Sequence, residues 1–218
     1  MLSKEQIEGN KIEFLALLRT VTREGARIEE LIEKLESSDF FTAPSSIKYH
    51  GAYEGGLCDH SLNVYYNMMH LLTYKAPILG IDVEQLHESV LIVSLLHDIS
   101  KMNLYTVTTK NVKVYSPDGN REDSGGKFYW DSVPSYAIRE PEDRLIYGSH
   151  EQNSDFIIRH FIPLSIEEGT AILHHMGGMS WDSAKDNITE VYGKYTLAVL
   201  LHLADMLATY VDEKEKHE

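Results

Sequence analysis

Cysteine and long apolar stretches are what this sequence of 218 residues lacks most clearly. Its single cysteine, Cys58, excludes an internal disulfide and a zinc site built from several thiolates, and it is typical of a reducing compartment. No apolar run approaches the roughly 18 residues of a transmembrane helix, and the first residues lack the apolar stretch of a secretory signal. We therefore expect a cytoplasmic protein that does not contact a membrane.

Basic residues are also few. The chain has 20 Lys and Arg residues against 34 Asp and Glu residues, which gives a formal net charge of −14. That charge repels nucleic-acid phosphates and argues against extended RNA or DNA as a partner, while a local basic pocket stays compatible with it. Hydrophobic residues make up 43% of the sequence, too many for a disordered chain, so we expect one sizeable core or at most two small ones.

Apolar residues recur with helical spacing through most of the chain. The pattern predicts helices over residues 3–19, 24–36, 59–74, 83–99, 149–161, 165–176 and 195–211. Residues 103–149 differ, because the runs LYTVTT, VKVYS and KFYWDSV are rich in β-branched and aromatic residues and SPDGN is a turn signal. The sequence therefore predicts one mostly α domain over residues 1–218, with N-terminal helices in 1–38 and a small β-hairpin or three-stranded insertion.

Two acidic residues lie in or directly after very apolar helices. His97-Asp98 ends the run SVLIVSLL, and Asp205 lies inside TLAVLLHLADMLATYV with no Lys or Arg one turn away. A buried carboxylate costs several kcal/mol unless it is paired or binds a metal ion. An exposed stretch of helix or a distant Arg partner is the alternative explanation for Asp205.

Histidine is abundant, with 11 residues, and several lie at the ends of predicted helices. His60 and His150 open helices, and His174 and His175 close one. Imidazole and carboxylate ligands without thiolates suit Zn, Mn, Fe, Co or Ni, and carboxylates also suit Mg. We interpret the remaining histidines of the helices and the tail as ordinary packing or surface residues, although His202 shares a helix face with Asp205; these are His70, His87, His160, His202 and His217.

Five motifs in order resemble the HD-domain superfamily of metal-dependent phosphohydrolases. HGAYEGGLCDHSLNV (residues 50–64) is similar to the His-x-Ala-Tyr-x-Gly-Gly-Leu-x-x-His-Ser/Thr-Leu run of the branch that includes bacterial 3′–5′ exoribonucleases and phage and bacterial hydrolases. LIVSLLHDISK resembles the helix that ends in His-Asp-Ile-Gly-Lys, with Ser100 in place of the usual Gly. His150, AILHHMGGM and LLHLADMLAT complete the set. The resemblance implies an HD-type helical bundle.

The resemblance also implies a site for one or two divalent metal ions. One ion takes His60, His97, Asp98 and Asp205. A second takes Asp98 as a bridge, His150 and His174, with His175 either replacing His174 or holding it in place. Asp98, Lys101 and His50 are the expected catalytic residues, and Lys101, His50 and Tyr53 are the expected substrate-binding residues. His50 either donates to a phosphate oxygen or protonates the leaving group, and packing within its loop is the alternative explanation for this histidine.

Three functions stay open at this point. The first is hydrolysis of a nucleotide or related phosphate ester by a metal-activated water. The second is a phosphodiesterase or 3′–5′ exonuclease on short oligonucleotides or cyclic nucleotides, and the third is a non-catalytic regulator that binds metal or nucleotide. The absence of a Gly-Tyr-Pro run after the last histidine pair, of an N-terminal OB-type barrel and of excess basic charge favours a small phosphorylated substrate.

The insertion adds a prediction about substrate choice. Its aromatic residues can stack on a base at the mouth of the site, or can simply pack against one another; they are Tyr115, Phe128, Tyr129 and Trp130. Because the insertion leaves the helical chain directly after Lys101 and carries several basic residues, we expect it to form either a lid beside the site or a contact in a homo-oligomer. The basic residues are Lys110, Lys113, Arg121, Lys127, Arg139 and Arg144.

Overall fold

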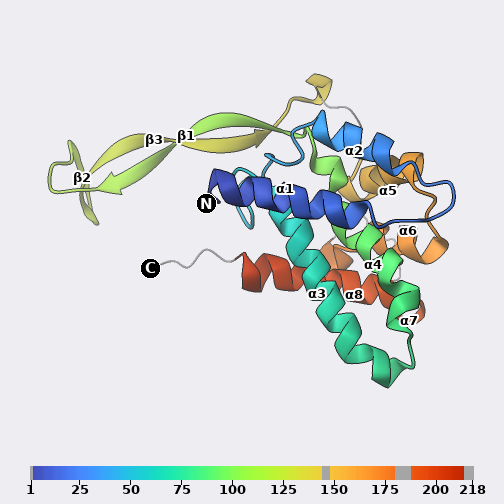
Figure 1. Cartoon of the computed structure of the whole chain (residues 1–218). Coiled ribbons are helices and arrows are strands. Elements are labelled where there is room, and N and C mark those ends of the chain that lie inside the picture. Colours follow the sequence, from blue (N-terminus) through green and yellow to red (C-terminus); the bar gives the residue numbers. More distant parts are fainter. Residues whose placement is uncertain (1, 144–147, 180–187, 214–218) are drawn as a thin grey trace.

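The computed structural model describes residues 2–143, 148–179 and 188–213 (Figure 1). Over these residues the protein is mostly helical, with eight α-helices and one three-stranded antiparallel sheet, which confirms the prediction of a mostly α protein with a small β insertion. None of the described helices is long and apolar enough to cross a membrane. The predictions made for Arg144, for His217 and for the charged tail after Glu213 lie outside the described residues.

The two N-terminal helices form as predicted, with shifted bounds. Helix α1 (Lys4–Leu18) starts at Ser3, whose side chain accepts from the backbone N–H of Gln6 in a capping box. Helix α2 (Ile28–Glu36) starts four residues later than expected, because the chain first turns through Gly25 at a φ of 80°. Both helices bury apolar stripes in the common core.

Helix α3 (Gly56–Leu79) is longer than the predicted 59–74 at both ends. Neither Asp59 nor Ser61 caps it. Gly55 precedes it at a φ of 82°, and a Cβ on Gly56 would lie 2.0 Å from the carbonyl oxygen of Gly51, so the first turn requires glycine. Pro77 lies within the last turn of the helix rather than ending it.

Helix α4 (Val83–Leu96) lies at the centre of the molecule, and its last seven residues are all buried. It packs against α3, which in turn contacts α8 (Thr196–Leu207) (Figure 1). These three helices therefore bring the predicted His and Asp ligands on or next to them into one core. Helices α5 (His150–Phe161) and α6 (Ile166–Leu173) cover one side. Helix α7 (Ile188–Lys194) was not predicted: it is only seven residues long, too short for the apolar spacing to stand out, and none of its residues is fully buried.

The predicted insertion is a long β arm. Strands β1 (Tyr105–Tyr115) and β3 (Gly126–Ile138) pair antiparallel over eleven positions, and short β2 (Arg121–Asp123) adds to β3 at the far end, in the order β1-β3-β2. Two runs expected as separate strands are thus one strand, β1. The arm leaves the helical body near η1 (Ile99–Lys101) and projects away from it (Figure 1).

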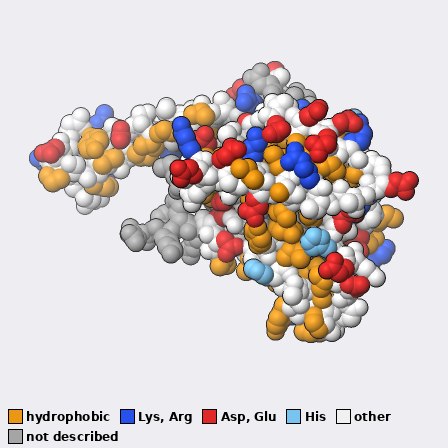
Figure 2. All heavy atoms as spheres, viewed as in Figure 1, with side chains coloured by type: hydrophobic (Ala, Val, Ile, Leu, Met, Phe, Trp, Pro, Cys, Tyr) orange, Lys and Arg blue, Asp and Glu red, His pale blue; other side chains and the backbone are white. Residues whose placement is uncertain are grey.

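The four aromatic residues named for the insertion, Tyr115, Phe128, Tyr129 and Trp130, lie toward the far end of the arm, where Figure 2 also shows hydrophobic side chains. Phe128 pairs in register with Arg121 of β2, is 7% exposed, and has its ring 6.0 Å from those of Tyr115 and Trp130. Lys113 lies over the Phe128 ring, 4.2 Å from its centroid. Of the two alternatives for these aromatic residues, Tyr115, Phe128 and Trp130 thus show the second, packing against one another at the tip of the arm.

A buried ion pair fastens α6 to the loop after α1 and gives a prediction on stability. Glu168 is 1% exposed and accepts two hydrogen bonds of 2.7 Å from Arg23, which also contacts Glu88. We expect Glu168→Ala to lower the free energy of unfolding by about 3 kcal/mol, the lower end for breaking a buried pair, because Arg23 keeps Glu88. Urea unfolding measures this, with Glu29→Ala, which breaks the exposed Arg19–Glu29 pair, as a control expected below about 1 kcal/mol.

The same ion pair also makes the stability of the folded protein depend on pH. Burial alone would raise the pKa of Glu168, but the hydrogen bonds from Arg23 and Ser89 outweigh it and hold the pKa below its ordinary value of 4.5. The folded state therefore gains stability from ionised Glu168 above about pH 4.5 and loses it as the pH falls further. The stability gap between wild type and Glu168→Gln should narrow below that pH, and a gap that stays constant down to pH 3 would contradict the assignment.

Candidate metal centre

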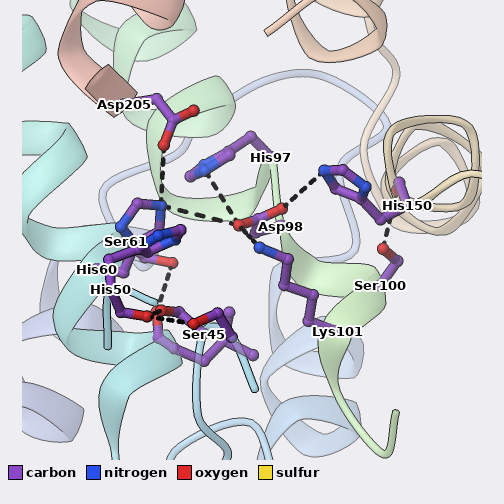
Figure 3. A network of polar contacts seen from close by, with 12 residues as sticks. Ser45, His50, His60, Ser61, His97, Asp98, Ser100, Lys101, His150 and Asp205 are labelled. Carbon is purple, nitrogen blue, oxygen red and sulfur yellow. Dashed lines mark hydrogen bonds and ion pairs between the residues drawn. The ribbon is translucent and has the colours of Figure 1, made fainter. Parts of the chain in front are cut away.

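The His97-Asp98 pair lies at the end of the buried helix α4, as predicted. Its backbone leaves the helix at Asp98, whose φ of −108° and ψ of 14° turn the chain into η1. This break holds the Asp98 carboxylate, 2% exposed, in the middle of the core rather than on a helix face. Figure 3 shows side chains from α3, α5 and α8 pointing toward it.

Asp98 presents one oxygen to each of two histidine pairs. Its Oδ2 lies 3.8 Å from Nε2 of His60 and 3.5 Å from Nε2 of His97, while its Oδ1 lies 3.7 Å from Nε2 of both His150 and His175. Two groups that could hold a metal ion therefore share this carboxylate: His60, His97 and Asp98, and Asp98, His150 and His175.

All four rings have the same orientation. His97 and His175 direct Nδ1 at the carbonyl oxygens three residues earlier, Ser94 at 2.8 Å and Ile172 at 2.7 Å. His60 and His150 direct Nδ1 at carboxylates, at 3.0 Å and 3.3 Å, which belong to Glu213 and Glu151. Each Nδ1 can therefore carry the proton, and each Nε2 faces Asp98.

Several atoms that face the centre have no hydrogen-bond partner. Within the described residues, Nε2 of His97 and of His150 and Oδ1 of Asp98 are buried and unbonded, while the buried Nε2 of His60 has the carboxylate of Asp205 at 3.2 Å. Three unbonded atoms at one place would cost several kcal/mol in a protein that left them unpaired. The donor set, imidazole nitrogen and carboxylate oxygen, fits a divalent ion of the Zn, Mn, Fe, Co or Ni type.

Asp205 comes to this centre from α8, on the side of the first group. Its Oδ1 lies 3.2 Å from Nε2 of His60, and no Arg or Lys pairs with it in the described part of the chain (Figure 3). Burial alone would raise the pKa of Asp205, but His60 and the neighbouring imidazoles outweigh it and lower the pKa below its ordinary value. The acidic residue that looked misplaced in an apolar helix thus stays ionised beside the histidines.

Burial keeps two of the rings neutral. It lowers the pKa of His97 to about 3 and that of His150 to about 4, so both present a lone pair at neutral pH. For His60 burial acts in the same direction, but the carboxylates of Glu213 and Asp205 prevail and raise its pKa to about 10 without a metal ion. A cation at the centre would replace the proton that lies between His60 and Asp205.

Lys101 also reaches the centre. One turn beyond His97-Asp98, its Nζ lies 2.6 Å from Oδ2 of Asp98, and its side chain is 13% exposed. Burial alone would raise the pKa of Asp98, but the charge of Lys101 and, after it, the neighbouring imidazoles outweigh burial and hold the pKa well below its ordinary value. Lys101 is the cation that faces Asp98 in the metal-free protein.

The structure also places His174, Tyr53 and His50. His175, not His174, joins the second group; Nδ1 of His174 lies 2.9 Å from the carbonyl of Thr170, and the ring is outside both groups. The hydroxyl of Tyr53 donates to Asp59 at 2.7 Å, so it ties the loop to α3. The ring of His50 lies 5.0 Å from that of His60, at the edge of the centre.

Sequence reasoning missed two carboxylates. Glu213 belongs to the charged run DEKEKHE, a composition typical of a solvated tail, yet its side chain is 1% exposed and contacts His60. Glu151 follows His150 directly and is 3% exposed. Only its position next to a predicted ligand could have singled out Glu151, and no local pattern marks Glu213. No protein-family model, no curated protein and no solved structure matches this chain.

Proposed function

We propose that this protein is a metal-dependent phosphohydrolase of the HD-domain type, acting on a small phosphate ester such as a nucleotide. The observation that carries the proposal is the set of buried, unbonded Nε2 and Oδ1 atoms around Asp98. Protein cores leave such atoms unpaired only where another group takes them up, and a divalent cation suits all of them at once.

The two groups of ligands support a pair of ions. His60, His97, Asp98 and Asp205 would hold one, and Asp98, His150 and His175 the other, with Asp98 shared. Ions in such a pair lower the pKa of a bound water and so supply a nucleophile at neutral pH.

The chain's own residues supply the rest. Once Asp98 is taken up as a ligand, the ammonium of Lys101 is free to neutralise a phosphate oxygen of the substrate. Burial, with the nearby charges of His60 and Lys101, lowers the pKa of His50 to about 4, so its ring is neutral near pH 7. His50 therefore donates a hydrogen bond to the substrate rather than a proton to the leaving group.

A small substrate fits the charge of the protein better than an extended nucleic acid. The net charge is −14, and Figure 2 shows Asp and Glu spread over the visible face of the helical body. A long polyphosphate backbone would be repelled over most of that face, whereas a single phosphate group is drawn in by the ions and by Lys101. A phosphodiesterase acting on cyclic or very short nucleotides uses the same chemistry.

The test combines metal analysis with a panel of substrates. The purified protein is loaded with Mn, Co, Ni, Zn or Mg and assayed for phosphate release from nucleoside mono-, di- and triphosphates, cyclic nucleotides and dinucleotides. We expect bound metal near one or two ions per chain and turnover of at least one small nucleotide. Absence of both metal binding and turnover across the panel would overturn the proposal.

Adjacent histidines provide a matched pair of variants. His175→Ala removes a member of the second group, while His174→Ala removes its neighbour in sequence, which lies outside both groups and directs Nδ1 at the carbonyl of Thr170. We expect His175→Ala to lose the second ion and at least about tenfold in turnover, and His174→Ala to keep its metal content. Equal metal loss in the two variants would contradict the assignment of His175.

A further inference from the structure

Glu213 makes the longest-range contact at the metal centre. It directly follows the π-helical turn η4 (Ala208–Asp212), which continues α8, and its backbone N–H donates to the carbonyl of Ala208 at 2.9 Å. The side chain turns back against α3. There one carboxylate oxygen, Oε1, lies 3.0 Å from Nδ1 of His60 and accepts a hydrogen bond of 3.1 Å from Nδ2 of Asn63.

Burying the Glu213 carboxylate in this position costs folding free energy unless a partner compensates for it. Its side chain is 1% exposed, and its second oxygen, Oε2, is buried without a hydrogen bond. Among the ion pairs of the described residues, the one that Glu213 forms is with His60. The wide π turn that brings Glu213 inward is itself a feature often found at functional sites.

His60 needs this contact more than the other rings do. His97 and His175 have their Nδ1 fixed by a carbonyl of the preceding turn, and His150 has Glu151 beside it in sequence. No backbone carbonyl contacts Nδ1 of His60 in the described structure; Glu213 takes that place from 153 residues further along the chain. A carboxylate on the outer nitrogen fixes the tautomer of a ligating histidine and makes it a better donor to metal.

We propose that Glu213 is a positioning residue: it holds Nδ1 of His60 so that Nε2 points at the first metal site, and it makes the turn after α8 part of that site. This inference rests on the proposed metal site. It assigns to the C-terminal turn a role in metal affinity, although no atom of Glu213 reaches the ion.

A neighbouring carboxylate gives a matched control. Asp212 accepts a hydrogen bond of 2.6 Å from Nδ2 of Asn67, one turn along α3 from Asn63, and thus also ties the turn to α3 without touching His60. The experiment compares Glu213→Ala, Glu213→Gln and Asp212→Ala, with Mn²⁺ and Zn²⁺ affinities measured by calorimetry and folding checked by thermal unfolding.

We expect Glu213→Ala to bind the first ion about 10 to 100 times more weakly. Asp212→Ala should bind as the wild type does. Glu213→Gln should recover part of the affinity, because its amide oxygen can still accept from Nδ1. Affinity in Glu213→Ala equal to that in Asp212→Ala would overturn the inference and leave the metal site standing.

A measurement without metal separates the two proposals. In NMR spectra of the metal-free protein labelled on histidine, the Nδ1 proton of His60 should be protected from exchange in wild type and Asp212→Ala and exposed in Glu213→Ala. If the wild type binds no ion, the proposed function fails, and the inference fails with it. Protection unchanged in Glu213→Ala overturns the positioning role whatever the metal data show.

Discussion

Asp98→Asn is expected to remove both ions and with them hydrolysis. One oxygen of Asp98 faces His60 and His97 and the other faces His150 and His175, so no other residue of the described centre belongs to both groups. An amide keeps the shape but loses the charge that two cations require. Because loss of a residue that only orients a ligand already costs about 10- to 100-fold, we expect turnover to fall by more than about 100-fold.

Metal content by mass spectrometry and turnover with the best substrate of the panel measure this effect together. Asp155→Asn is the control, since Asp155 pairs with Arg159 on α5, away from the centre. Thermal unfolding shows whether Asp98→Asn still folds, because the change also leaves Lys101 without its carboxylate. A folded Asp98→Asn that keeps two ions and wild-type turnover would mean that the ions, or the reaction, are elsewhere.

The core of the site could be predicted because polar, ionisable residues stand in or next to very apolar helices. Asp205 in an apolar helix and His97-Asp98 after another are local conflicts, and a conflict of that kind is visible in the sequence without any knowledge of the fold. The structure resolves the conflict for Asp205 with His60, a residue of a different helix. The sequence indicates that a partner is needed, while the packing of α3 against α8 supplies it.

The choice between His174 and His175 could not be made from the sequence. Helix α6 ends at Leu173, and beyond that residue the helical period no longer says which of two neighbours faces inward. His174 still has its N–H bonded to Thr170 as in a helix, and only the next residue turns into the core. The contact of Glu213 could not be predicted either. It depends on the π-helical turn Ala208–Asp212, which shifts Glu213 by one position relative to a regular α-helix.

The orientation of the β arm relative to the helical body also could not be predicted from the sequence. Its strands follow from β-branched and aromatic composition, but almost every position of β1 is exposed, so no alternation of apolar and polar residues tells which side the body lies on. Only Tyr105 at its base is buried, with its hydroxyl near the carbonyl of Ser45. The role of the arm in a homo-oligomer stays a prediction.

Lys101→Met is expected to destabilise the metal-free protein strongly. Burial alone would lower the pKa of Lys101, yet Asp98 holds it above its ordinary value, so the pair is fully charged inside the core. Without the ammonium, the negative charge of Asp98 is left with imidazoles of which His97 and His150 are neutral. Breaking a buried pair from one side costs about 3–5 kcal/mol, and urea unfolding in the presence of a chelator measures it.

Metal should reverse this loss, because a divalent ion supplies the charge that Lys101 provides in its absence. We expect the rise in unfolding temperature on adding Mn²⁺ or Zn²⁺ to be larger in Lys101→Met than in wild type, since the ion no longer displaces an ammonium from Asp98. Lys113→Met is the matched control: Lys113 pairs with Asp123 at the tip of the arm, in solvent, and its loss should change neither quantity appreciably. If Lys101→Met gains no more from metal than Lys113→Met does, the ion and Lys101 do not compete for Asp98.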